Sequence, residues 1–246
     1  MGTVLVKGTG IDSKPHLSGL QVQTHQLNEV SLTFHAEDAQ GHPVNNLKLD
    51  DLIIYDNYKP PRKLLVFRSL PDIPIHAGLI LNTSESMQEP ISHARRVAIE
   101  YVQRLLRPRV DRAFSEDFGY VSRITQTWTG DRTALAAGIG EATMGIDNPR
   151  GGTALFETLY SACLYQFGKS DLPASGNVIL LFTDGEDNTG HIDLKSVVDT
   201  CQRTNTSIYA FRPPTLESGS SGPRNLAVLT SQTGGRVFDI DESEAE

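Results

Sequence analysis

Five polar side chains, at three separate places in the chain, have the chemistry to hold a hard metal cation together. They are an amide (Asn82), three hydroxyls (Ser84, Ser86 and Thr153) and a carboxylate (Asp184). Hard cations such as Mg²⁺ take oxygen ligands in near-octahedral geometry and usually keep several waters. The set therefore predicts a shallow site for Mg²⁺, or for Mn²⁺ or Ca²⁺, in which a vacant position could accept the carboxylate of a protein partner.

The elements around these residues would bring them together. Residues 76–81 and 177–182 are nearly all-apolar runs, which is typical of strands buried on both faces of a parallel sheet. The first run leads into Asn82 and the second leads to Asp184, while a glycine pair ahead of a predicted helix leads to Thr153. Because ligands of open α/β sheets bind beyond the carboxyl ends of the strands, we expect all five side chains at that edge.

From residue 75 onward, strands and helices are expected to alternate. Strand patterns cover residues 75–81, 113–119, 122–128, 177–182, 207–211 and 236–238. Helical patterns cover residues 91–105, 131–143, 154–167, 192–204 and 224–233. Alternation of this kind implies right-handed crossovers and a sheet covered on both faces. The predicted fold class is α/β, with a doubly wound, mostly parallel, Rossmann-like sheet.

The first 74 residues differ from the rest. Strand-like alternation appears over 30–36, 52–56 and 63–68, and nothing there has a helical pattern. We therefore predict a small N-terminal antiparallel β-subdomain with its linker over 1–74 and an α/β domain over 75–240. The acidic tail over 241–246 is expected to fray.

The order of the motifs resembles a known family. Asn82-x-Ser84-x-Ser86, then Gly152-Thr153, then Thr183-Asp184-Gly185 follows the metal-ion-dependent adhesion site (MIDAS) of von Willebrand factor A (VWA) domains. The resemblance spans residues 75–238 and implies Ser84, Ser86 and Thr153 as direct ligands, with Asn82 and Asp184 acting largely through bound water. Residues 151–159 and 178–188 also look like a bacterial VWA group known chiefly from Acidobacteria, in which a β-rich segment precedes the domain.

Asn82 departs from the family pattern, which has aspartate there. An amide oxygen can accept a hydrogen bond from a metal-bound water, but it carries no charge. A charge pair at ~4 Å contributes up to about 4 kcal/mol at an effective dielectric near 20. Even reduced by water, this predicts a loss of cation affinity of about tenfold or more. Glu85 stands where a glycine is usual, and its carboxylate is a candidate to restore the missing charge.

Each motif also has a structural interpretation. Ser86 with Glu89 has the spacing of a capping box, and Thr153 could be a plain helix N-cap. Asp184-Gly185 is a common turn pair. For each motif taken singly, the structural interpretation is the more frequent one. The joint occurrence of the three motifs in this order, however, favours the VWA fold.

Composition narrows the class of protein. The net charge of −8 and a pI near 5.4 argue against nucleic acid as the main partner. No apolar run approaches the ~20 residues of a membrane span, and the N-terminus lacks the apolar core of a signal peptide. Similar proteins are often exported, so the resemblance implies a periplasmic or cell-surface location. Cys163 and Cys201 are interpreted as buried free thiols, with a disulfide between them left open.

Three functions follow in order of preference. The first is a non-enzymatic protein–protein interaction or cell-adhesion module that uses the cation site. The second is a structural or scaffolding VWA domain that has lost the metal, which Asn82 favours. The third is a metal-dependent hydrolase, against which the sequence offers no second carboxylate cluster, nucleophile–base pair or cofactor loop.

Overall fold

The structure is a computed structural model and describes residues 4–8, 16–26, 29–40, 44, 46–56, 58–64, 66–68, 73–141, 152–168, 176–213 and 220–240. Its contacts divide the chain into two compact units, Met1–Ile73 and Pro74–Glu246. The predicted boundary at residue 74 lies beside this division, and independent folding of the two units stays a prediction. The acidic tail over 241–246 lies outside the described residues.

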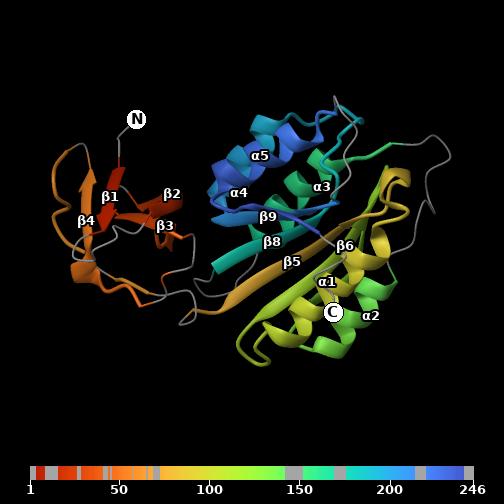
Figure 1. The fold of residues 1–246 in the computed structure, drawn as a ribbon, viewed down its shortest axis with the longest axis horizontal. Coiled ribbons are helices and arrows are strands. Elements are labelled where there is room, and N and C mark those ends of the chain that lie inside the picture. The colour runs from red at the N-terminus through yellow and green to blue at the C-terminus, as the bar shows by residue number, and fades with distance from the viewer. Residues whose placement is uncertain are drawn as a thin grey trace. The chain divides into compact units, whose positions relative to one another are not determined.

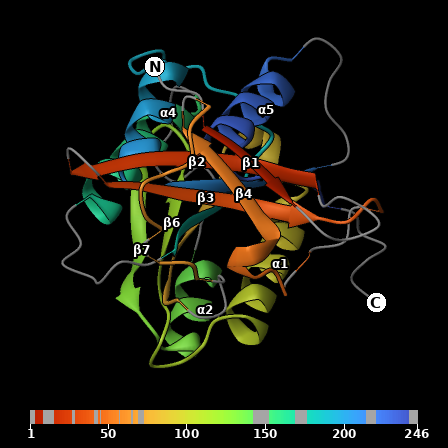
Figure 2. The same ribbon diagram turned by 90° about the vertical axis from the view of Figure 1, so that its left-hand side faces the viewer.

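The N-terminal unit is built from short antiparallel ribbons (Figures 1 and 2). Its strands are β1 (Val4–Gly8), β2 (His16–Gln26), β3 (Glu29–Glu37) and β4 (Leu52–Asp56), and a 3-10 turn, η1 (Leu49–Asp51), precedes β4. β1 pairs with β4, and β2 pairs with β3. The antiparallel β-subdomain is therefore confirmed.

One expected strand of this unit is wrong. The described residues of 63–68 form no ladder, and a β-strand exists only where a neighbour supplies hydrogen bonds. The alternating pattern indicated the two strands that became β3 and β4, but β1 and β2 were missed.

The second unit alternates strands and helices as expected. Its strands are β5 (Ile75–Asn82), β6 (Arg112–Phe118), β7 (Ser122–Thr129), β8 (Gly176–Phe182), β9 (Thr206–Arg212) and β10 (Val237–Asp239). Its helices are η3 (Glu85–Met87), α1 (Ile91–Arg104), α2 (Arg132–Gly140), α3 (Leu155–Ser161), the π-helical continuation η4 (Ala162–Phe167), α4 (Leu194–Arg203) and α5 (Gly222–Thr233).

The six strands form one sheet in the order β10-β9-β8-β5-β6-β7, in which only β6–β7 is antiparallel. β5 and β8 are central neighbours, yet the chain leaves them for opposite sides of the sheet. Such a point, where strand order reverses, opens a crevice beyond the carboxyl ends of the strands. The doubly wound, mostly parallel fold class is thus confirmed, and Asn82 and Asp184 follow the two strands that flank the crevice.

Helices cover both faces of the sheet (Figure 1). α1 and α2 pack with alternate residues of β5 and β8 in one core, represented by Leu79, Val102 and Leu180. α3, η4, α4 and α5 pack on the opposite face in a second core, represented by Phe114 and Leu181. Because each central strand is apolar on both sides, the sheet is held by two cores rather than one.

A disulfide joins Cys163 of η4 to Cys201 of α4, across a Cα–Cα distance of 5.0 Å. The interpretation as free thiols is therefore wrong. η4 and α4 pack side by side on the same face of the sheet. Both cysteines point into that contact with no exposed surface, which the sequence spacing alone did not reveal.

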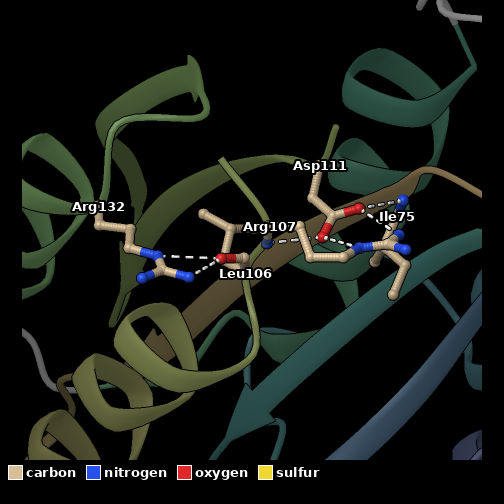
Figure 3. A network of polar contacts seen from close by, with 5 residues as sticks. All are labelled: Ile75, Leu106, Arg107, Asp111 and Arg132. Atoms are coloured by element: carbon tan, nitrogen blue, oxygen red, sulfur yellow. Dashed lines mark hydrogen bonds and ion pairs between the residues drawn. The ribbon is translucent and has the colours of Figure 1, made fainter. Parts of the chain in front are cut away.

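A polar network ties the amino end of β5 to the turn before β6 (Figure 3). Asp111 accepts from the Ile75 amide (2.9 Å) and from the Arg107 amide (2.8 Å), Nε (2.9 Å) and Nη2 (2.7 Å). Burial alone would raise the pKa of Asp111, but these hydrogen bonds outweigh it and hold the pKa below its ordinary value. Arg132 of α2 donates to the Leu106 carbonyl beside this network.

Candidate metal centre

Asn82 and Asp184 meet at the carboxyl edge of the sheet. Parallel pairing of β5 with β8 sets Leu81 opposite Phe182, so the next residues of both strands emerge together. Asn82 Nδ2 donates to Thr183 Oγ1 (2.9 Å) and to Asp184 Oδ1 (3.3 Å). Asn82 is fully buried and Asp184 is 7% exposed, so this contact is largely shielded from water.

Ser84 and Ser86 follow Asn82 closely in the chain. The Ser84 amide donates to Asn82 Oδ1 (2.8 Å), which turns the chain back over the strand end. The two serine Oγ atoms lie 3.2 Å apart. Ser84 is buried, whereas Ser86 is exposed on η3. Two hydroxyl oxygens thus converge at the mouth of the crevice.

The capping-box interpretation of Ser86 is wrong. α1 begins at Ile91, its N-cap is Pro90, and no side chain caps it. Ser86 lies within η3, and Glu89 directly precedes the N-cap instead of lying in the first turn of the helix, as a capping box requires. The position of Ser86 is therefore set by the η3 turn rather than by α1.

Thr153 comes to the same edge from the segment before α3. Gly152 has φ +130°, a conformation that side chains rarely adopt, and this turns the chain into Thr153. The Thr153 amide donates to Asn188 Oδ1 (2.6 Å), and the Asn188 amide donates to the Thr153 carbonyl (3.1 Å). The N-cap of α3 is Ala154, so the interpretation of Thr153 as a plain N-cap is also wrong.

The loop that carries Asp184 is anchored to α5. Gly185 has φ +88°, in the left-handed region that favours glycine, so a glycine is suited to the position after Asp184. Glu186 accepts from Ser221 Oγ and the Gly222 amide, both at 2.7 Å, where a carboxylate stabilises the helix N-terminus. Burial would raise the pKa of Glu186, but these hydrogen bonds lower it.

The same loop is anchored to α3. Asp187 Oδ1 accepts from the Phe156 amide (3.0 Å) in the first turn of the helix. Burial raises the pKa of Asp187, and the nearby charge of Glu157 adds to this effect. The loop after β8 therefore connects three elements, because its successive side chains form hydrogen bonds with β5, α5 and the start of α3.

Structural relatives were found, although no family model and no curated protein matches the sequence. BatB from Bacteroides thetaiotaomicron is similar with a TM-score of 0.57 at 16% identity, over 70% of this chain and 92% of that one. An aerotolerance-related membrane protein from Bacteroides fragilis gives 0.55 at 15% identity, over 70% and 94%. Proximal thread matrix protein 1 from the mussel byssus, with a zinc-occupied MIDAS motif, gives 0.56 at 17% identity, over 70% and 43%.

The fold is that of VWA domains. The chain spans under half of the mussel protein, 43% of its length. The narrower resemblance to an acidobacterial group stays a prediction. In the part of the chain that the structure describes, no helix is both long and apolar enough to cross a membrane.

The donor atoms of this VWA edge fit a hard divalent cation. Ser84 and Ser86 offer two hydroxyl oxygens 3.2 Å apart, and Asp184 offers a carboxylate. All three hydrogen bonds to Asp184 from described residues end on Oδ1, from Asn82, Thr183 and Glu186. The described residues form no group of three His, Cys, Asp or Glu suited to a metal, so hydroxyls would supply most ligands.

Polar side chains outside the five predicted site residues also shape this unit. His93 of α1 is only 6% exposed, and its Nδ1 lies 3.0 Å from Arg96 Nη2. The anchoring roles of Glu186, Asp187 and Asn188 were missed. The sequence feature that could have indicated these roles is the run of polar residues after a buried strand, because this run is longer than a tight turn needs.

Proposed function

We propose that the VWA unit is a non-enzymatic interaction module that presents a divalent cation to an acidic side chain of a protein partner. Ser84, Ser86 and Thr153 would be direct ligands, and Asp184 and Asn82 would act mainly through bound water. The cation would supply an electrophilic position for a carboxylate. Mg²⁺ is the expected ion, with Mn²⁺ or Ca²⁺ as substitutes.

The observation that carries this proposal is the convergence of the Ser84 and Ser86 hydroxyls at the edge where Asp184 emerges. Neither serine caps α1 and Thr153 does not cap α3, so helix capping does not account for these residue types. The zinc-occupied MIDAS motif of the mussel protein, on the same fold, gives further support.

A second candidate is a scaffolding VWA domain without metal, and one contact favours it. Asn82 Nδ2 donates to Asp184 Oδ1, so a neutral donor already stabilises the carboxylate that a cation would otherwise neutralise. In this view the Asn82 side-chain amide takes the place of the metal and holds Asp184 against the end of β5.

Calorimetric titration of Mg²⁺ and Mn²⁺ into metal-free protein separates the two candidates. We expect the wild type to bind in the micromolar to low-millimolar range. The Asn82→Asp variant should bind at least about tenfold more tightly, since a charge near the cation contributes 1.4 kcal/mol or more. Ser84→Ala should abolish the heat signal, and Glu89→Gln, an exposed carboxylate nearby, is the matched control.

The outcomes differ sharply. If the wild type shows no heat of binding while Asn82→Asp does, the scaffold candidate replaces the cation-dependent one. If neither protein binds Mg²⁺ or Mn²⁺, this edge resembles a metal site in sequence but does not bind these ions. A loss of binding in Glu85→Gln would mean that this exposed carboxylate supplies the charge that Asn82 lacks.

We assign binding rather than catalysis because the edge offers hydroxyls, an amide and one carboxylate. No nucleophile–base pair is present among the five site residues. Metal-dependent hydrolysis that disappears in Asp184→Asn would overturn this assignment.

We also propose an exported location. The disulfide between Cys163 and Cys201 supports it, because disulfides persist in oxidising compartments and are rare in the cytosol. Alkylation of the denatured, unreduced protein from its host checks this: both cysteines should resist modification until a reductant is added, whereas free thiols would react at once.

A further inference from the structure

A cavity of about 300 Å³ opens beside the proposed metal edge. Its walls come from the β6–β7 turn, the first turns of α3 and the loop before α4, and include Tyr120, Ser122, Glu157, Ser161, Thr189 and His191. This volume suits a single long side chain. The described lining contains a carboxylate and several hydroxyls but no lysine or arginine, so it would favour a cation.

The cavity lies beside the segment that carries Thr153. A Cβ atom added at Gly152 would lie 3.1 Å from Tyr120 Cδ2, so this ring packs against the glycine that precedes Thr153. Tyr120 is 44% exposed and its neighbour Val121 is 50% exposed. Exposed large apolar side chains at the rim of a polar pocket are typical of protein-binding surfaces.

Glu157 projects into the cavity from α3. Its Oε2 accepts a hydrogen bond of 2.5 Å from Thr189 Oγ1, which fixes the carboxylate against the opposite wall. A half-buried carboxylate held in this way is oriented before any ligand arrives, which lowers the cost of binding.

A second carboxyl is connected to the cavity through one lining residue, although it does not line the cavity itself. Glu116 of β6 is only 4% exposed and hydrogen bonds with Ser122, which lines the cavity. Its Oε2 is buried and has no hydrogen-bond partner in the described structure. A buried acceptor without a donor destabilises the protein, so it indicates a missing ligand atom or water.

We propose that this cavity binds an arginine side chain of a protein partner, with the Glu157 carboxylate as its charged partner and Glu116 acting through its hydrogen bond with Ser122. Guanidinium carries five donors in a plane and stacks on aromatic rings, which matches the Glu157 carboxylate, the hydroxyls of Ser122 and Ser161, and the exposed Tyr120 ring. The inference rests on the proposed interaction role in one respect, that the side chain comes from a protein, and it requires no metal.

The test uses blocked arginine (N-acetyl-arginine N-methylamide) and its neutral isostere, blocked citrulline, added to the full chain in excess EDTA. Amide chemical shifts are followed by NMR. Saturable shifts in residues 120–122 and 157 are expected for arginine, with a dissociation constant on the order of 1 mM for so small a ligand. Citrulline should bind at least about tenfold more weakly, because it carries no positive charge to pair with the Glu157 carboxylate.

Glu157→Gln should weaken arginine binding by about tenfold, and Glu116→Gln should weaken it less. Glu100→Gln removes an exposed carboxylate on α1 and is the matched control. Ser84→Ala should leave arginine binding unchanged while it removes cation binding, so the two sites can fail separately. Equal binding of arginine and citrulline to the wild type would overturn the proposal, as would the absence of shifts around the cavity.

Discussion

The two edges of the central sheet each present a buried aspartate, and the chain treats the two in opposite ways. At the amino edge, both oxygens of Asp111 accept hydrogen bonds of 2.7–2.9 Å from Arg107 and Ile75. At the carboxyl edge, Asp184 receives bonds of 3.3–3.4 Å, all on Oδ1, and none from a charged side chain of the described residues.

The difference separates a carboxylate that the protein neutralises by itself from one that it leaves available. Short, charge-assisted hydrogen bonds are about twice as strong as neutral ones. Asp111 therefore fixes the fold, and its environment leaves no position for a ligand. Asp184 is held in place by neutral donors and retains capacity for a cation.

The largest expected effect comes from the amino edge. Asp111→Ala leaves Arg107 without its carboxylate and should reduce the free energy of unfolding by about 3 kcal/mol, the low end for a broken buried pair, because Arg107 is 36% exposed. Urea unfolding at pH 7 measures this. The exposed pair Arg104–Glu100 is the control, and Arg104→Ala should cost under about 0.5 kcal/mol.

The pH dependence of Asp111→Ala sharpens the comparison. Because hydrogen bonding lowers the pKa of Asp111 in the folded state, its stabilisation is present at neutral pH and is lost as the pH falls below about 4. The difference between wild type and variant should shrink over that range. An equal difference at pH 3 and pH 7 would mean that packing, and not charge, makes Asp111 important.

A smaller effect is expected for Glu116, which lies between the two edges on β6. Burial raises the pKa of Glu116 from 4.5 to about 7, so the folded state binds its proton more tightly than the unfolded chain does. Wild-type stability should therefore fall as the pH rises from about 5 to about 8. Glu116→Gln should gain about 2 kcal/mol relative to wild type across that window. Parallel pH profiles of the two proteins in urea unfolding would contradict the prediction.

The smallest effect concerns the carboxyl edge without a ligand. Asn82→Asp puts two carboxylates where an amide now donates to Asp184 over 3.3 Å, and their repulsion should cost about 1 kcal/mol in EDTA. Saturating Mg²⁺ should reverse the loss in thermal unfolding and have less effect on wild type. If Mg²⁺ stabilises both proteins equally, the missing charge at Asn82 does not limit cation binding at this edge.

The α/β unit could be predicted because its signals are local and repeated. The runs that became β5 and β8 are nearly all apolar and show no alternation of polar residues, and the amphipathic stripe of α1 is continuous. The N-terminal unit was harder, since alternating patterns do not tell which segments pair. Segment 63–68 alternates but has no partner in the described structure.

The residue types of the site could be predicted from the sequence, but the hydrogen bonds that hold them in place could not. Asn82 and Asp184 were placed together because each comes at the carboxyl end of an apolar strand, and the structure brings them within hydrogen-bond distance. The contacts of Asn188 with Thr153 join residues 35 positions apart through a loop that has no periodicity. The pairing of Cys163 with Cys201 likewise depends on how two helices face each other.

The disulfide has a topological consequence. Together with the backbone between its two cysteines it closes a covalent ring of the chain, and this ring contains β8 and the loop from Thr183 to Asn188. A single protease cut anywhere within the ring leaves the two fragments linked. A nicked molecule would therefore migrate as one species on a non-reducing gel and as two on a reducing gel, because the bridge alone keeps the fragment with Asp184 joined to the other fragment.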